Sequence, residues 1–298
     1  YNAQMVNIAP IDKIGLVSGF GRMLGYSGAI LALYFIKPIV LKSGYQATFL
    51  PTGILFLIFA LPCMVFLKDN PSQGKISLIY FLKKSSLIEI FKNIKATAFD
   101  AYRFPGLLDF LKASFFGLCA VNVIILFMSV YATRVFGLSE TAIINLIAFA
   151  TIFAMAGSMF SGFISDYIGY KRCLIAVFIL WGVCFLIGTF VRSTHLYWLI
   201  GALVGIALGS TWVVSRALAV RLVPAEKIGE AFGLFNFVGY FSGIAGPLYW
   251  GTILLFLYPL GELGYRIALL SLILFMLLGL IFLLRLPADR QASQIKNK

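Results

Sequence analysis

Eight long apolar segments determine what this chain can fold into. They run over residues 14–37, 46–67, 108–133, 141–165, 173–191, 196–220, 228–257 and 263–285. A helix needs about 20 apolar residues to cross the roughly 30 Å hydrocarbon core of a bilayer. Hydrophobic residues make up 61% of the 298 residues and charged residues only 12%, against roughly 25% charge in soluble domains. Because few segments alternate as barrel strands do, we expect an all-α polytopic membrane protein.

The charge and the reactive residues exclude several classes of function. A net charge of +13 on a soluble protein would suggest nucleic acid, but basic residues orient membrane proteins, so no nucleic-acid partner is expected. The four cysteines lie in apolar segments without CxxC spacing, and His195 is the single histidine. We therefore expect no metal site and no cofactor. Without clustered acids or an ATP-binding glycine loop, we also expect no enzyme.

One connector differs from the short turns elsewhere. Residues 68–107 carry seven basic residues against three acids, and apolar residues recur there at near-helical spacing. This pattern predicts an amphipathic helix on the anionic cytoplasmic leaflet of the bilayer. A loop that binds a partner protein is the alternative.

The basic residues also predict an orientation. With residues 68–107 inside, eighteen basic residues face the cytoplasm and one, Arg22, lies within a span. Five face outside, namely Lys37, Lys42, Arg134, Arg192 and Arg266. This asymmetry places the C-terminus in the cytoplasm.

An internal repeat relates two parts of the chain. Residues 10–26 shifted by 214 fall on 224–240, with seven of 17 positions identical, where chance predicts one or two. The following segments, 46–67 and 263–285, also align. Four apolar segments precede the second copy and none precedes the first.

If the two halves are equivalent, the intact molecule has six plus six helices about a pseudo-twofold axis, the architecture of major facilitator transporters. The chain is then an N-terminally truncated fragment of it. Residues 1–67 would end the N-terminal half (helices 5 and 6) and 68–107 would form a cytoplasmic linker. The C-terminal half (helices 7–12) would occupy 108–286, before a cytoplasmic tail at 287–298.

The connector from Gly162 to Arg172 carries a gating candidate. It reads Gly162-Phe-Ile-Ser-Asp166-Tyr-Ile-Gly169-Tyr-Lys171-Arg172, which resembles the major facilitator motif G-x3-D-x2-G-x-[KR]-[KR], with Tyr167 in place of a basic residue. Gly162 would let helices approach closely and Gly169 would supply a tight turn. Asp166 could pair with Lys171 or Arg172, or face a helix N-terminus of the other half as a charge latch. The alternative is a polar turn that obeys the positive-inside rule.

Three rows of glycines predict helix packing. They lie at spacings of three and four residues, so each row occupies one helical face and allows a close approach. The rows are Gly21/Gly25/Gly28, Gly201/Gly205/Gly209 and Gly239/Gly243/Gly246. In a transporter, such smooth faces also permit sliding.

Polar residues inside the spans are the substrate-binding candidates, because lipid exposure would be costly for them. Arg22 lies about 13 Å along its helix from Lys13, and we expect it to line a cavity and contact a carboxylate or another anion. The alternative is a structural pair with an acid elsewhere. Asn236 is its repeat partner. Asn122 and Asn145 are weaker candidates, since such residues more often bond between helices.

Longer stretches resemble one group, the "unknown major facilitator" group, whose relatives include fungal vacuolar amino-acid effluxers linked to autophagy. The resemblance rests on the following residues: Tyr1-Asn2-Ala3, Ala9-Pro10, Ser18-x2-Gly21-x3-Gly25-Tyr26-x-Gly28, Arg103-Phe104-Pro105, Gly205-x3-Gly209-x5-Ser215-Arg216, Phe232-Gly233 and Gly246-Pro247. It implies a small-solute transporter, with amino acids as the suggested substrates and a proton as a coupling ion. The sequence departs from the group at Arg22, where an aromatic residue is expected, and beside Asn122, where an acid is expected.

Two functions follow as hypotheses. The first is a secondary or facilitative transporter that works by alternating access. The second is a membrane scaffold or sensor that keeps the fold and has lost transport. The expected location is the inner membrane of a bacterium, or a vacuolar or other internal membrane of a eukaryote.

Overall fold

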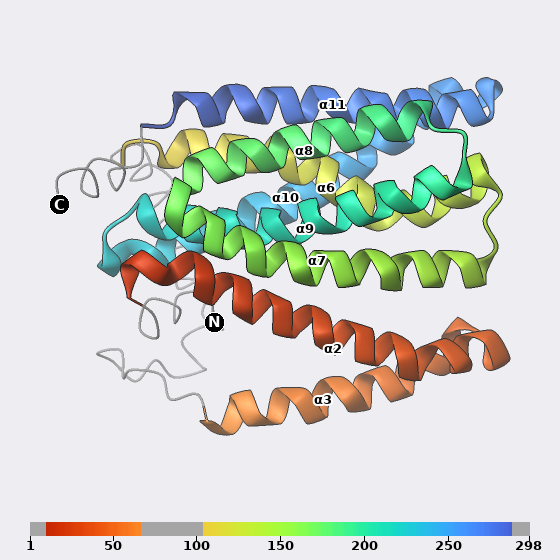
Figure 1. The fold of residues 1–298 in the computed structure, drawn as a ribbon, viewed down its shortest axis with the longest axis horizontal. Helices are drawn as coiled ribbons and strands as arrows, with labels where there is room; N and C mark the ends of the chain where they lie inside the picture. The colour runs from red at the N-terminus through yellow and green to blue at the C-terminus, as the bar shows by residue number, and fades with distance from the viewer. Residues whose placement is uncertain (1–9, 67–103, 288–298) are drawn as a thin grey trace, which may run out of the picture. The chain divides into compact units, whose positions relative to one another are not determined.

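The computed structural model describes residues 10–66 and 104–287, and these form long helices without any strand (Figure 1). Within these described residues, eight helices are long and apolar enough to cross a membrane. They are α2 (Ile14–Ser43), α3 (Phe49–Phe66), α6 (Leu107–Phe136), α7 (Glu140–Ile168), α8 (Tyr170–Phe190), α9 (Thr194–Arg221), α10 (Ile228–Leu257) and α11 (Glu262–Arg285). The prediction of an all-α polytopic membrane protein is confirmed.

Local chemistry sets the helix ends close to the predicted positions. Gly137 ends α6 at a φ of 62°, and its N–H donates to Thr133 O at 3.0 Å, the bond that defines the αL motif at a helix C-terminus. Ser139 then caps α7 by accepting from the Ala142 N–H. The first span was expected to end near residue 37, but α2 continues through Pro38 to Ser43.

The chain divides into two compact units. The first unit holds the start of α2, up to Ser27, together with α6 to α11. Within it, α7 packs chiefly on α9, α6 packs on α10 and α11, and α8 packs on α9 and α11. Large apolar side chains fill its core, among them Trp181, Tyr197 and Phe110. Other apolar side chains of these helices point outward, as a lipid-facing surface requires.

The second unit, residues 28–100, holds the end of α2, the 3-10 turn η3 (Tyr45–Thr48) and α3. No described residue of this unit is buried, and its exposed side chains are mostly apolar, including Phe49, Phe56 and Phe59. Such a composition suits helices surrounded by lipid or by other helices.

The internal repeat is visible in the structure. The 3-10 turn η2 (Ile11–Lys13) precedes α2, and η5 (Ala225–Lys227) precedes α10 at the equivalent place. When residue numbers are shifted by 214, the first and last residues of α2 correspond to the first and last residues of α10, and each helix has 30 residues. Pro10 and Pro224 open the two turns and accept N–H bonds of 2.9 and 3.0 Å from Lys13 and Lys227. The two sequences therefore encode the same local structure.

Two predicted elements lie outside the described residues. They are the amphipathic helix of the 68–107 connector, apart from residues 104–107, and the tail from residue 288 onward. Both stay predictions.

Candidate functional site

The carboxylate of Asp166 contacts the N-terminus of α2. Its two oxygens accept the backbone N–H groups of Gly15 and Leu16 at 2.9 and 2.8 Å. The hydroxyl of Tyr170 donates a third hydrogen bond of 2.6 Å to the same carboxylate. A helix N-terminus has unpaired N–H groups and a partial positive charge, so a carboxylate is a favourable partner there.

Three glycines make this contact possible. A Cβ on Gly15 would lie 2.6 Å from Gly162 O, and a Cβ on Gly19 would lie 2.5 Å from Ser158 O. A Cβ on Gly162 would in turn meet the backbone of Gly15 and, at 3.2 Å, the Cα of Gly19. Any side chain at these positions would push α2 and α7 apart, and the N–H groups would then lie out of reach of Asp166.

The basic residues of the motif have other roles. Lys171 donates to the backbone carbonyls of Leu284 (3.1 Å) and Leu286 at the C-terminal end of α11, where a cation is stabilised by the helix dipole. Arg172 is exposed and has no ion pair within the described residues. Of the two predicted arrangements for Asp166, the structure therefore shows the helix N-terminus and not the pair with Lys171 or Arg172. Gly169 provides the turn between α7 and α8 at a φ of 97°.

Arg22 lies in a nearby cluster of aromatic rings. Its guanidinium carbon is 4.9 Å from the ring centre of Tyr26 and 5.4 Å from that of Trp212 on α9. Neither its buried Nε nor the buried Tyr26 hydroxyl has a hydrogen-bond partner among the described residues. Arg22 is thus a partly buried cation held by aromatic faces, without an acid among the described residues.

A second arginine lies beside this cluster. Arg216 donates through Nε to Trp212 O at 3.1 Å and through Nη2 to Ser18 O at 3.3 Å. Arg22 itself lies about 12 Å from the start of α2 and about 10 Å from the centre of this 30-residue helix.

The three candidate asparagines do not join Arg22 in one site. Asn122 on α6 donates to Ser242 Oγ on α10 at 3.2 Å, which is the interhelical bond that such residues commonly make. Asn236 on α10 and Asn145 on α7 are exposed on their helices. Their substrate roles stay predictions.

The three glycine rows differ in what they contact. Cβ atoms on Gly201, Gly205 and Gly209 would clash with α7, and one on Gly246 would clash with Cys119 of α6. Cβ atoms on Gly239 and Gly243 would lie 3.9 and 3.8 Å from Leu118 and Asn122 of α6, an ordinary van der Waals distance. No described atom comes within 4 Å of a Cβ on Gly21, Gly25 or Gly28, so a packing role for that row stays a prediction.

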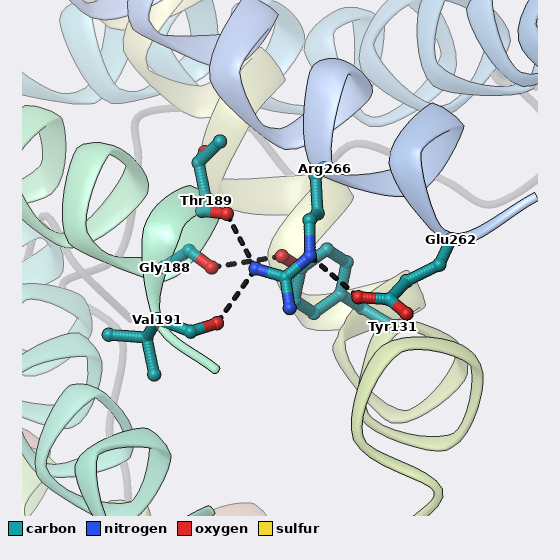
Figure 2. Close-up of polar contacts among 6 residues, drawn as sticks. All are labelled: Tyr131, Gly188, Thr189, Val191, Glu262 and Arg266. Atoms are coloured by element: carbon teal, nitrogen blue, oxygen red, sulfur yellow. Dashed lines mark hydrogen bonds and ion pairs between the residues drawn. The ribbon is translucent and has the colours of Figure 1, made fainter. Parts of the chain in front are cut away.

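Sequence reasoning missed a polar cluster at the opposite end of the helices (Figure 2). Arg266 Nη1 donates to the carbonyls of Thr189 (2.6 Å) and Val191 (2.7 Å), where α8 ends, and its Nε donates to Glu262 at 2.8 Å. The Tyr131 hydroxyl donates to Gly188 O at 2.9 Å. Only the spacing of Glu262 and Arg266, four residues apart on one helix, was a signal in the sequence.

These features define a helical, multi-pass integral membrane protein built around a repeated helix pair. The chain belongs to the Major Facilitator Superfamily, whose sequence pattern matches residues 1–247 and again residues 110–298. The predicted family is therefore confirmed. Within the described residues, no group of three or more His, Cys, Asp or Glu could hold a metal ion.

Several known proteins are similar to the chain. It is 25% identical over 261 residues to YxiO, an uncharacterized MFS-type transporter of Bacillus subtilis. The aligned region covers 83% of the chain and 59% of YxiO. It is 26% identical over 268 residues to autophagy-related protein 22 of Vanderwaltozyma polyspora, 80% of the chain and 51% of that protein. A Na(+), Li(+), K(+)/H(+) antiporter of Planococcus maritimus is 27% identical over 157 residues, 51% of the chain and 36% of the antiporter. The chain spans about three-fifths of the length of YxiO and less of the other two.

Proposed function

We propose that the intact protein is a secondary or facilitative transporter of a small solute that works by alternating access. The observation that carries this proposal is the contact of Asp166 with the N-terminus of α2 across the glycine crossing. In the proposal, this contact is a latch that stabilises one conformational state and opens in the other.

The chemistry of the contact suits a latch that opens. It consists of charge-assisted hydrogen bonds to two backbone N–H groups, and no bulky side chain interlocks the helices at Gly15, Gly19 and Gly162. A carboxylate at a helix N-terminus contributes about 0.3–2 kcal/mol. A latch of that strength shifts an equilibrium between two states without locking the protein in one of them.

Arg22 supports a substrate with a negative group. Its charge is partly buried against Tyr26 and Trp212, and no described acid neutralises it. An anionic or zwitterionic solute would supply the missing counter-charge. Amino acids are the class that the resemblance suggests, and the antiporter among the similar proteins supports coupling to a proton gradient.

The test is Asp166→Asn in the intact protein reconstituted into proteoliposomes, with labelled amino acids and an imposed pH gradient. The amide keeps the shape of the side chain and removes the charge. We expect turnover to fall several-fold while substrate binding changes little, because the latch affects interconversion of the two states rather than substrate contact.

The matched control is Glu140→Gln on the same helix, an exposed acid at the opposite end of α7. It should leave turnover unchanged. Weakened binding with normal turnover in Asp166→Asn would contradict the latch.

A second candidate function is a scaffold or sensor that keeps the fold without transport. It is favoured by the position of the acids, because every Asp and Glu in the described residues lies within the first or last turn of a helix or in a 3-10 turn. The middle of each described span therefore lacks a carboxylate that could carry a proton. Absence of flux of the intact protein across a broad panel of solutes would support this alternative.

A further inference from the structure

Three arginines gather where the helices end on the side that the charge distribution places outside. Arg134 ends α6, Arg192 follows α8, and Arg266 lies in the first turns of α11. They are three of the five basic residues assigned to that side. We propose that this end of the first unit holds a binding site for the headgroup of an anionic phospholipid. The inference goes beyond transport and does not depend on it.

The site consists of two adjoining hollows that share Glu262. The larger has a volume of about 810 Å³, with Arg192 and Arg266 in its lining. The smaller has a volume of about 510 Å³ and is lined by Arg134 and Tyr258, among others. Both volumes are in the range of ligand-binding clefts.

The charges of the hollows are unbalanced. Glu262 pairs with Arg266, whose Nη1 also binds two backbone carbonyls. Arg134 and Arg192 are exposed and form no ion pair or hydrogen bond with a described residue. The hollows thus have a formal charge of +2. The like charges brought together from α6, α11 and the connector after α8 repel one another, and an anion bound between them removes that repulsion.

The walls favour a lipid over a soluble anion. Leu263, Ile267 and Leu270 are spaced by four and three residues, so they form one apolar face of α11 in the larger hollow. Phe190 extends that face, and both Phe190 and Leu263 are exposed, at 69% and 55%. A soluble phosphate gains nothing from such a wall, whereas the acyl chain of a phospholipid buries apolar area against it.

The position of the hollows is also that of a headgroup. The C-terminal ends of α6, α8 and α10 meet the start of α11 there (Figure 1), at a depth where spanning helices leave the hydrocarbon core. Tyr258, which is 83% exposed, lines the smaller hollow, and tyrosine is enriched at membrane interfaces. Guanidinium groups bind phosphate oxygens through paired hydrogen bonds.

Native mass spectrometry of the intact protein in detergent tests the proposal. Phosphatidylglycerol and phosphatidylcholine of matched chain length are titrated separately. We expect more phosphatidylglycerol adducts, and we expect Arg192→Gln to weaken their binding about fivefold, the effect of one arginine near an anionic headgroup. Arg134→Gln should act in the same direction. Leu263→Gln should weaken phosphatidylglycerol binding and leave any binding of inorganic phosphate unchanged.

The matched control is Lys42→Gln, which removes another positive charge assigned to the same side but absent from the lining of both hollows. Equal effects of Lys42→Gln and Arg192→Gln would overturn the site, and so would equal binding of the two lipids. Inorganic phosphate that displaces phosphatidylglycerol at comparable concentration would show a soluble-anion site instead and overturn the lipid assignment. Circular dichroism melting verifies that each variant is folded.

Discussion

At the scale of single residues, three charged side chains contact the backbone at helix ends. Asp166 contacts N–H groups where α2 begins, whereas Lys171 and Arg266 contact carbonyls where α11 and α8 end. Each charge therefore has the sign that the local helix dipole favours. Arg22 is different, because its neighbours are aromatic rings and its buried Nε has no described partner. That difference makes it the residue with the clearest substrate hypothesis.

Replacement of Arg22 by alanine should therefore strongly reduce transport of an anionic or zwitterionic solute by the intact protein. The variant removes the positive charge that lies over the rings of Tyr26 and Trp212, and the loss of one charge-assisted contact lowers affinity roughly tenfold or more. Uptake into proteoliposomes measures the effect, and membrane fractionation verifies insertion.

Arg22→Lys is the informative companion variant, because it keeps the charge and loses the planar donor geometry. We expect partial uptake from it. Unchanged uptake by Arg22→Ala would remove this residue from the binding site and leave it as a structural cation.

At the scale of secondary-structure elements, glycines set how closely two helices approach. Gly205 of α9 lies so close to α7 that a Cβ would clash with the carbonyl of Ala150. At Gly182 of α8, by contrast, no described atom lies within 4 Å of the position that a Cβ would occupy. The two positions separate the packing role of a glycine from its intrinsic cost to a helix.

Gly205→Ala should destabilise the protein by about 1–3 kcal/mol, since overpacking of a tight contact forces the helices apart. Gly182→Ala should be neutral or slightly stabilising, because alanine is the better helix former by about 1 kcal/mol. Thermal unfolding of the detergent-solubilised intact protein, followed by circular dichroism, distinguishes them. A similar melting temperature for both variants would contradict the packing argument.

The spans were predictable because a bilayer fixes their length and local residues fix their ends. The α10 span was expected over residues 228–257 and has those bounds. The partners of the charged residues were not predictable. Asp166 binds backbone groups 150 and 151 residues away, and Arg266 binds carbonyls 77 and 75 residues away. Backbone donors and acceptors occur at every residue, so nothing in the sequence singles these out.

The spacing of glycines within one helix also did not predict which helix packs against them. Spacing showed that Gly21, Gly25 and Gly28 share a face, but it could not show what faces them. The glycines that contact α7 are instead Gly15 and Gly19. Such pairing depends on tertiary contacts between distant helices, which a periodic pattern in one helix does not encode.

At the scale of the whole molecule, the two repeat copies have the same backbone but different surroundings. Gly15 and Gly19 lie against Gly162 and Ser158 of α7, whereas their counterparts Gly229 and Gly233 have no described atom within 4 Å of a Cβ. Identical glycines in identical local structure suggest the same use in both copies. The six-plus-six architecture therefore predicts that, in the intact protein, a helix equivalent to α7 packs over Gly229 and Gly233.

This prediction is tested by Gly233→Leu in the intact protein. If a helix crosses there as α7 crosses Gly19, the leucine should overpack the contact and destabilise the protein by about 1–3 kcal/mol. Gly182→Leu is the control, because open space surrounds that position too and no repeat partner predicts a crossing there. Thermal unfolding in detergent measures the stability of both variants. An unchanged melting temperature for Gly233→Leu would mean that α10 keeps an open face, and the two halves would then not be equivalent.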